Sequence, residues 1–327
     1  MPRRVPRRVP CRPLRRPRLR SAAIVGKRDL VNAAPDILCI GSVLWDIIGR
    51  APTHMAAGAD VPGRITRLPG GVAMNLAATF ARFGLTAAVL SAVGRDGEGD
   101  ELVAACARRG IDTRHLYRSD DLPTDRYMAV EGANGLIAAV ADAHSLEAAG
   151  AKILRPLEDG RLGSADAPWA GLIALDGNLT QELLADVAGS AAFRAADLRV
   201  APASPGKAER LLPLLPRARV TLYVNLEEAG LICQRRFAGA AEAAAGLVAR
   251  GAARVLVTDG GRPCAEATHQ RLLESCPPPV LVTRVTGAGD TFMAAHIVAE
   301  RAGKDPAAAL EAALAAAADY VSGGAGG

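Results

Sequence analysis

The sequence predicts an α/β fold: a doubly wound, mostly parallel sheet flanked by helices, with a small β lid. Three observations carry this prediction. Short apolar segments typical of buried strands alternate with longer segments that have helical periodicity. Glycine follows several of these segments, where a chain stops or turns. Hydrophobic residues make up 50% of the 327 residues although only 3% are aromatic, so a large core of Ala, Val, Leu and Ile is available.

The first strand is expected at residues 36–40, an apolar run followed by Gly41. A helix is expected after the Gly70-Gly71 pair, because Leu76, Phe80 and Phe83 fall on one helical face and Gly84 follows. Residues 87–93 predict the next strand and residues 100–109 the next helix. Further strands are expected at 171–175, 198–201, 220–224 and 255–258, and further helices at 179–189, 205–215, 239–250, 288–302 and 306–320.

Two stretches break this alternation. Residues 44–68 are rich in turn formers, and residues 124–141 contain two apolar segments, 126–130 and 136–140, around Gly132-Ala133-Asn134-Gly135. That arrangement predicts a hairpin. Strand insertions in a doubly wound domain often cover the site, so we expect a lid near 44–68 and 124–141.

The formal net charge of +5 belongs to one end of the chain. Residues 1–28 hold eleven Lys and Arg and no acid, which leaves 28 basic and 34 acidic side chains elsewhere, a net charge of −6. The five prolines at 2, 6, 10, 13 and 17 forbid a regular helix. We therefore expect 1–34 to be a disordered extension and 35–327 to be one domain. An RNA-binding arm is the alternative for the extension, but the acidic body predicts no nucleic-acid partner.

No run of 18 apolar residues predicts a membrane span, and the extension lacks the apolar centre of a secretory signal. The six cysteines form no CxxC pair and do not cluster with histidine at metal spacing, which argues against a zinc site. These features predict a cytoplasmic protein without a membrane partner.

The segment Thr286-Gly287-Ala288-Gly289-Asp290 precedes an expected helix. Such a turn presents backbone N–H groups to one point, and the helix dipole adds positive potential there. A phosphoryl group suits that place, and the Asp290 carboxylate could take a proton from an attacking hydroxyl. Alone, this pattern is equally compatible with a tight turn at a helix N-terminus.

Other segments favour a ligand site. Gly70 and Gly71 with Asn75 form a second glycine-rich helix start, where a ligand can approach closely. Asp46 follows a strand at the carboxyl edge, where open α/β sheets bind ligands. Asn225 and Glu228 follow another strand, and a carboxylate there can hold Mg²⁺ through water. A turn cap for Asp46 and a solvated first-turn acid for Glu228 are the alternatives.

In their order and spacing these segments resemble the ribokinase-like carbohydrate and nucleoside kinases, the PfkB family. The resemblance runs from about residue 36 to residue 320, and its most specific part is the final motif. The segments that carry it are GSVLWD (41–46), PGGVAMN (69–75), AVGRDGEG (92–99), NLEE (225–228), VTDGG (257–261) and VTGAGD (285–290).

The resemblance implies ATP-dependent phosphorylation of a sugar hydroxymethyl group, with Mg²⁺ and with K⁺ left open. It implies that Asp290 is the base, and that Gly287, Ala288 and Gly289 form the anion hole. It implies that the substrate is bound by Asp46, Gly70, Gly71, Asn75, Thr124 and Tyr127. It implies that the nucleotide is bound by Asn225, Thr258, Gly260 and Thr286, and that Glu228 binds the metal. For Thr124 and Tyr127, a packing role in the hairpin is an equal alternative.

Within the family, three segments are similar to the pseudouridine kinase subgroup. They are VTGAGD, the DGNL run that contains Asp176 and Asn178, and the APAS run followed by Lys207. The resemblance implies that Asp176 and Asn178 also bind the substrate. This implies phosphorylation of the 5′-hydroxyl of pseudouridine. The chain departs from the pattern at Ala201, at Asp259 with the segment 262–264, and at Arg284, which bears on the nucleotide contacts and any monovalent-cation site.

Two alternatives stay open. A kinase for ribose, fructose or a purine nucleoside would keep the chemistry and change the substrate. A non-catalytic sugar- or nucleoside-binding regulator would keep only the fold, and it has no need of a base at Asp290. The lid strands are also candidates for pairing in a homodimer, because exposed sheet edges invite pairing.

Overall fold

The computed structural model describes residues 34–323, so the basic extension predicted for 1–34 lies, apart from its last residue, outside the described residues. An eight-stranded sheet forms the centre, in the order β14-β13-β12-β11-β10-β9-β1-β4. All neighbouring pairs from β4 to β12 are parallel, whereas the β12–β13 and β13–β14 pairs are antiparallel. The strands are β1 (Ile37–Ile40), β4 (Ala87–Leu90), β9 (Leu172–Asp176), β10 (Asp197–Ala201), β11 (Val220–Asn225), β12 (Arg254–Thr258), β13 (Cys264–Thr268) and β14 (Leu272–Ser275).

Helices cover both faces of this sheet. In β1, Leu38 and Ile40 point into one apolar cluster and Ile37 and Cys39 into the other, and all four are fully buried. This two-sided burial explains the continuous apolar strands and confirms the predicted mostly parallel sheet. The helices are α1 (Val72–Arg82), α2 (Gly97–Arg108), α3 (His144–Ala149), α4 (Gln181–Gly189), α5 (Leu226–Cys233), α6 (Ala240–Ala249), α7 (Ala288–Arg301) and α8 (Pro306–Val321), with 3₁₀ segments η1 (Gly150–Leu157), η2 (Ala191–Phe193) and η3 (Pro205–Leu214).

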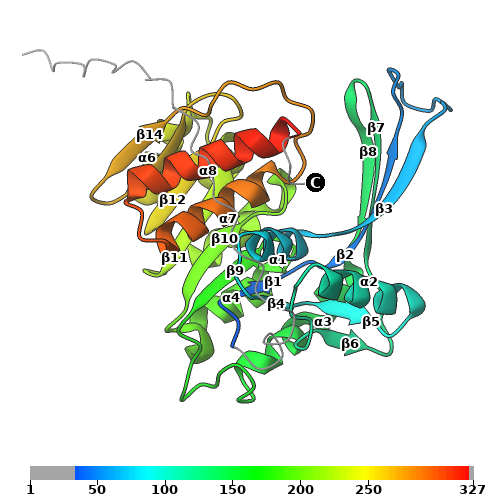
Figure 1. Cartoon of the computed structure of the whole chain (residues 1–327). Helices are drawn as coiled ribbons and strands as arrows, with labels where there is room; N and C mark the ends of the chain where they lie inside the picture. Colours follow the sequence, from blue (N-terminus) through cyan, green and yellow to red (C-terminus); the bar gives the residue numbers. More distant parts are fainter. Residues whose placement is uncertain (1–33, 324–327) are drawn as a thin grey trace, which may run out of the picture.

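Helices α7 and α8 lie side by side over one face of the sheet (Figure 1). Their buried residues join those of α1 and α2 in one cluster. Helices α4 and α6 pack on the opposite face. The helix that begins with the predicted phosphoryl-binding turn is therefore held directly on the sheet.

Two predicted elements differ from the structure. The strand expected at 87–93 divides into β4 and β5 (Ala92–Gly94), and β5 pairs with β6 (Tyr117–Ser119) in a separate two-stranded sheet. The helix expected at 205–215 is a 3₁₀ helix. Pro213 lies inside it, and proline lacks the N–H that an α-helix interior needs.

The two expected lid stretches form one four-stranded sheet in the order β3-β2-β7-β8. It projects from the main body in Figure 1, beside α1 and α2. The hairpin predicted at 124–141 is β7 and β8, and the turn-rich stretch 44–68 holds two seven-residue strands instead of mostly turns. We call this sheet of β2 (Leu44–Arg50), β3 (Arg64–Gly70), β7 (Arg126–Gly132) and β8 (Gly135–Asp142) the lid sheet.

No helix within residues 34–323 is long and apolar enough to cross a membrane.

Candidate active site

Parallel strands end at one edge of the sheet, and the predicted site residues gather at that edge. Ser42 follows β1, Asp176 ends β9, Asn225 ends β11 and Thr258 ends β12. The N-termini of α1 and α7 bring Asn75 and Asp290 to the same region. The edge is the usual ligand site of doubly wound sheets.

Asp176 accepts hydrogen bonds from three residues at this edge. It is fully buried, and its Oδ2 accepts hydrogen bonds from Ser42 N (2.7 Å), Ser42 Oγ (2.9 Å) and Ala73 N (3.2 Å). Its Oδ1 accepts from Asn178 N at 2.7 Å. A Cβ on Gly41 would lie 2.3 Å from this carboxyl group, so only glycine fits there. Burial raises the pKa of Asp176. Both oxygens are occupied by the protein, so Asp176 joins β1, α1 and β9 and offers little to a substrate.

Asn178 extends this network. Its Nδ2 donates to Ser42 Oγ at 2.8 Å, and its Oδ1 accepts from Lys207 Nζ. Ser42 also accepts from Val72 N at 2.9 Å, at the start of α1. Ser42 was not among the predicted site residues, although a hydroxyl directly after a strand and a glycine is a signal that could have marked it.

Asp46 lies on β2, in the lid sheet, with its carboxyl group against Gly70. A Cβ on Gly70 would lie 2.0 Å from Asp46 Oδ2. Gly71 has φ +92°, and its Cβ would meet the Ser42 carbonyl oxygen at 2.4 Å. The glycine pair therefore lets the chain segments of Asp46 and Ser42 approach closely, a different use from the close approach of a ligand that the sequence predicted. Burial raises the pKa of Asp46 to about 6.

Asp290 is partly buried in the first turn of α7 and accepts a hydrogen bond from Asn75 Nδ2 at 3.1 Å. Burial raises the pKa of Asp290 to about 7, the Asn75 bond opposes this shift, and the charges of Asp176 and Asp46 add to it. The structure thus brings Asp46, Asn75 and Asp290 together. A carboxyl group with a pKa near neutrality can take up and release a proton at physiological pH.

The turn before α7 has free donors. Gly287 has φ +87°, and a Cβ there would lie 2.6 Å from Tyr320 Oη, which donates to Thr286 O at 2.9 Å. Ala288 N already donates to Val285 O at 3.0 Å. The N–H groups of Gly289 and Asp290 donate to no acceptor within the described residues. Of the predicted anion hole, the N–H groups of Gly287 and Gly289 donate to no acceptor within the described residues, whereas that of Ala288 is used inside the turn. Asp290 adds a further free N–H group.

The two predicted lid residues are placed differently. Tyr127 is the register partner of Asp46 in the parallel β2–β7 pair, so both side chains lie on one face of the lid sheet. Burial and the Asp46 charge raise the pKa of Tyr127. Thr124 is buried, and its hydroxyl and N–H both donate to Asp96, at 2.6 and 2.8 Å. Of the two alternatives given for Thr124, the structure favours packing.

Asn225 and Glu228, which were predicted to bind nucleotide and metal, form a capping box at the start of α5. Glu228 N donates to Asn225 Oδ1 and Asn225 N donates to Glu228 Oε2, both at 2.8 Å. Burial raises the pKa of Glu228 to about 7. Its Oε1 has no hydrogen-bond partner within the described residues, so one oxygen of a buried carboxyl group remains for a ligand.

Thr258 is the register partner of Asn225, and Gly260 follows with φ +58°. Between them Asp259 forms an ion pair with Arg262 at 2.6 Å. A cavity of about 340 Å³ adjoins this segment and the start of α6. Its lining includes Gly239, Glu242, Asp259, Arg262 and Pro263.

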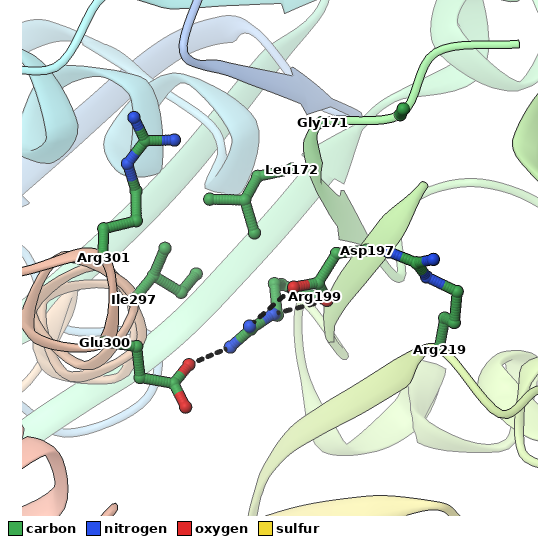
Figure 2. Close-up of a pocket in the computed structure, with 9 residues that line it drawn as sticks. Gly171, Leu172, Asp197, Arg199, Arg219, Ile297, Glu300 and Arg301 are labelled. Carbon is green, nitrogen blue, oxygen red and sulfur yellow. Dashed lines mark hydrogen bonds and ion pairs between the residues drawn. The ribbon is translucent and has the colours of Figure 1, made fainter. Parts of the chain in front are cut away.

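A slightly larger pocket, about 350 Å³, lies at the opposite edge of the sheet (Figure 2). Its lining includes the first residues of β9 and β10 and the end of α7. Arg199 crosses it, paired with Asp197 at 2.7 Å and with Glu300. Because these are the amino ends of the strands, this pocket is not the site that holds Asp46 and Asp290.

These features define an α/β protein in which a glycine turn with free N–H groups lies beside a partly buried carboxyl group at one sheet edge. Residues 34–324 match the pfkB family of carbohydrate kinases, and the chain belongs to that family. A ribokinase of Arabidopsis thaliana complexed with ribose and ATP is among the solved structures that are similar to it, at 21% identity and a TM-score of 0.67 over 88% of this chain and 93% of that chain.

Curated relatives are distant. The chain is 29% identical to the uncharacterized sugar kinase YeiI of Escherichia coli over 168 residues, 51% of this chain and 44% of that protein. It is 27% identical to the pseudouridine kinase of Arabidopsis thaliana over 57% of this chain and 46% of that protein. These two matches span less than half of each relative. The pseudouridine kinase of Escherichia coli matches at 27% identity over 79% of this chain and 81% of that protein.

Solved structures agree on the fold. A carbohydrate kinase from Agrobacterium tumefaciens superimposes with a TM-score of 0.71 at 26% identity, over 87% of this chain and 90% of that chain. The ribokinase of Thermotoga maritima gives a TM-score of 0.71 at 21% identity, over 88% and 93%. The predicted ribokinase-like fold is confirmed.

Proposed function

We propose that this protein transfers the γ-phosphoryl group of ATP to the 5′-hydroxyl of a nucleoside, with pseudouridine as the acceptor. The observation that carries this proposal is the position of Asp290. Its carboxyl group is held by Asn75, has a raised pKa, and lies in the helix turn that has free N–H groups at Gly289 and Asp290. Base and anion site thus share one turn.

In the proposed reaction the acceptor oxygen attacks the γ-phosphorus of ATP. A new O–P bond forms, the bond from that phosphorus to the β–γ bridging oxygen breaks, and ADP leaves with the electron pair. The hydroxyl proton passes to the Asp290 carboxylate. The N–H groups of Gly289 and Asp290 stabilise negative charge on the phosphoryl oxygens, which is the main demand of phosphoryl transfer.

The acceptor is proposed to lie between the lid sheet and α1. Asp46 and Asn75 would bind the sugar hydroxyl groups, and Gly70 and Gly71 would allow the close approach. Tyr127 shares the lid face with Asp46, which supports a contact with the same substrate. Asp176 and Asn178 would hold Ser42 and α1 in position instead of contacting the substrate.

The nucleotide is proposed to lie along Asn225, Thr258, Gly260 and Thr286. The unpartnered Oε1 of Glu228 fits a magnesium ion held through water, since Mg²⁺ keeps most of its waters and takes few protein ligands. No group of three or more His, Cys, Asp or Glu within residues 34–323 could hold a metal. Bound there, Mg²⁺ would neutralise phosphate charge. A requirement for K⁺ stays a prediction.

Pseudouridine is the proposed acceptor because two of the curated relatives are named pseudouridine kinases. One of them, from Escherichia coli, matches over most of its length. The alternative acceptors are ribose, fructose and purine nucleosides.

The test is ADP release by the full chain with Mg-ATP and a panel of pseudouridine, uridine, adenosine, ribose and fructose. We expect selective turnover of pseudouridine, with the phosphate on the 5′ oxygen by NMR. Turnover of another compound would keep the reaction and replace the substrate. Absence of any turnover, with nucleoside binding still seen by thermal shift, would favour the non-catalytic binder.

The homodimer through the lid sheet also remains a proposal. Ile65, Met128 and Val140 are 77%, 50% and 59% exposed, and by register they share the face opposite Asp46. A second copy pairing there would cover them. Light scattering of wild type and Met128→Glu tests this. A dimer that dissociates in the variant supports it, and a wild-type monomer rejects it. A cytoplasmic location and the absence of nucleic-acid binding by the body likewise stay predictions.

A further inference from the structure

The C-terminal end of α8 borders the glycine turn before α7. The two helices pack along each other, and α8 ends at Val321. Tyr320, in the last turn of α8, donates its hydroxyl proton to Thr286 O at 2.9 Å. A Cβ on Gly287 would lie 2.6 Å from the same hydroxyl oxygen. One hydroxyl group of α8 therefore lies against two successive residues of the turn.

The segment that leads into the turn has little packing of its own. Leu281, Val282 and Val285 are 82%, 56% and 71% exposed, and Thr286 is exposed as well. Within the described residues, Tyr320 is the only hydrogen-bond donor to the Thr286 carbonyl oxygen. A segment with few buried contacts opens easily. The position of Thr286 therefore depends on the Tyr320 hydroxyl.

The ring of Tyr320 is itself held in place by Arg284. The Arg284 guanidinium carbon lies 3.9 Å from the centroid of the Tyr320 ring, and Arg284 Nε donates to Tyr320 O at 2.8 Å. The backbone N–H groups of Thr283 and Arg284 donate to Val321 O at 2.7 and 3.2 Å. A cation is attracted to an aromatic face and to the C-terminal end of a helix. These contacts keep the Tyr320 hydroxyl directed at the turn.

The turn carries the groups on which the proposed reaction depends. The N–H groups of Gly289 and Asp290 donate to no acceptor within the described residues, and Asp290 is the proposed base. Their direction follows from the backbone of Gly287, whose carbonyl oxygen accepts from Thr291 N at 3.0 Å and from Thr291 Oγ1 at 2.9 Å. Hydrogen-bond donors stabilise a transition state when they are already aimed at the place where charge develops.

We infer that Tyr320 is a positioning residue for phosphoryl transfer: its hydroxyl group fixes the glycine turn so that the free N–H groups and the Asp290 carboxyl group meet the transferring phosphoryl group. The inference rests on the proposed function. Tyr320 acts through Thr286 and Gly287 without touching the substrate, and no covalent bond to it forms or breaks.

Two other roles of Tyr320 would give different measurements. If its hydroxyl only docks α8 onto the body, removing it should lower Tm and leave kcat unchanged. If the hydroxyl contacts ATP equally in the ground and transition states, its loss should raise the KM for ATP at constant kcat. Positioning of donors that act in the transition state lowers kcat and leaves both KM values nearly unchanged when it is lost.

The experiment compares steady-state kinetics of full-length wild type, Tyr320→Phe and Ser322→Ala, using the panel compound that wild type phosphorylates. Tyr320→Phe removes the hydroxyl group and keeps the ring beside Arg284. Ser322→Ala is the matched control, because Ser322 Oγ donates at 3.0 Å to Asp319 O, a carbonyl group of its own helix. We expect Tyr320→Phe to lower kcat on the order of tenfold, through a small displacement of the groups around the reacting atoms. Ser322→Ala should leave kcat unchanged.

Amide hydrogen exchange measures the turn without any turnover. The N–H groups of Ala288 and Thr291 each donate at 3.0 Å to a carbonyl oxygen of residues 285–287. When the hydroxyl bond to this segment is lost, both bonds should open more often. These two amides should therefore exchange faster in Tyr320→Phe than in wild type, whereas Ser322→Ala should match wild type.

Three results would overturn the inference: unchanged kcat in Tyr320→Phe, a lower kcat with unchanged exchange at the turn, or a rise in the KM for ATP alone. Failure of wild type to phosphorylate any panel compound would instead reject the proposed function, and the role in phosphoryl transfer with it. The exchange rates would still show whether the hydroxyl holds the turn. If Tyr320→Phe does not fold, as its Tm would reveal, Arg284→Met takes its place with the same expected directions.

Discussion

Asn75 on α1 and Asp290 on α7 are 215 positions apart in the chain, and the Asn75 amide donates to the Asp290 carboxyl group at 3.1 Å. The bond joins the starts of the two helices that border the candidate site. It also opposes the pKa increase that burial causes at Asp290. Asn75 thereby keeps part of the Asp290 population ionised near neutral pH.

Asp290→Asn removes the proposed base and keeps its shape. We expect kcat to fall on the order of a hundredfold or more, with nucleoside binding nearly intact, because only proton transfer is lost. Steady-state kinetics and nucleoside titration by calorimetry measure the two quantities. Glu311→Gln, on the exposed side of α8, is the control. A kcat within about threefold of wild type would show that Asp290 is not the base.

The pH dependence of kcat/KM should report Asp290 in the free enzyme. The ionised carboxylate is the active form, so activity should rise with pH through about 7. Asn75→Ala removes a hydrogen bond that lowers this pKa, so the rise should move to higher pH. The profile of each variant, taken with the same acceptor, tests this. A shift to lower pH would contradict the assignment.

Gly70→Ala should raise the acceptor KM. Its Cβ would lie 2.0 Å from Asp46 Oδ2, so the carboxyl group or β3 has to move. Gly97→Ala is the matched control, because a Cβ there meets no atom within 4 Å. KM for acceptor and for ATP should be measured separately. An increase confined to ATP would argue that Asp46 does not face the acceptor.

The raised pKa of Asp290 also predicts how stability depends on pH. The folded protein keeps this proton up to about pH 7, whereas the unfolded chain loses it near the ordinary value of 3.8. Wild-type stability should therefore fall, relative to Asp290→Asn, as pH rises from about 4 to about 7. Allowing for solvent screening, we expect a gain of about 1–2 kcal/mol for the variant at pH 8, or about 2–3 °C in Tm.

Calorimetric scans of both proteins at pH 5 and pH 8 measure this gap. It should be small at pH 5 and larger at pH 8. A gap that narrows as pH rises would mean that Asp290 is not buried as an unfavourable charge. The same variant would then be expected to lose activity without gaining stability.

Local patterns in the sequence were enough to predict most of the central sheet. Strands β1, β9, β10, β11 and β12 are each buried on both faces. A continuous apolar run therefore marks each strand in the sequence, even when its neighbours in the sheet are unknown. Strands β13 and β14 were missed because only weak apolar alternation marks them, with Glu266 inside one strand and Glu274 inside the other. Glu266 is buried because Arg254 and Arg271 pair with it.

The residues of the candidate site likewise fall into those that the sequence marked and those whose availability the fold decided. The sequence by itself marked Asp46, Asn75 and Asp290, because each stands beside a glycine turn or a strand end whose backbone geometry is local. Only the tertiary structure decided which side chains remain free. The Asp176 carboxyl group accepts hydrogen bonds from Ser42, Ala73 and Asn178, and the Thr124 hydroxyl donates to Asp96. Within the described residues, the Lys207 ammonium donates to Asn178 Oδ1 and forms no ion pair. Apart from the Asp176–Asn178 pair, these partners lie far apart in the chain, and a hydrogen bond forms only where the fold brings donor and acceptor within about 3 Å.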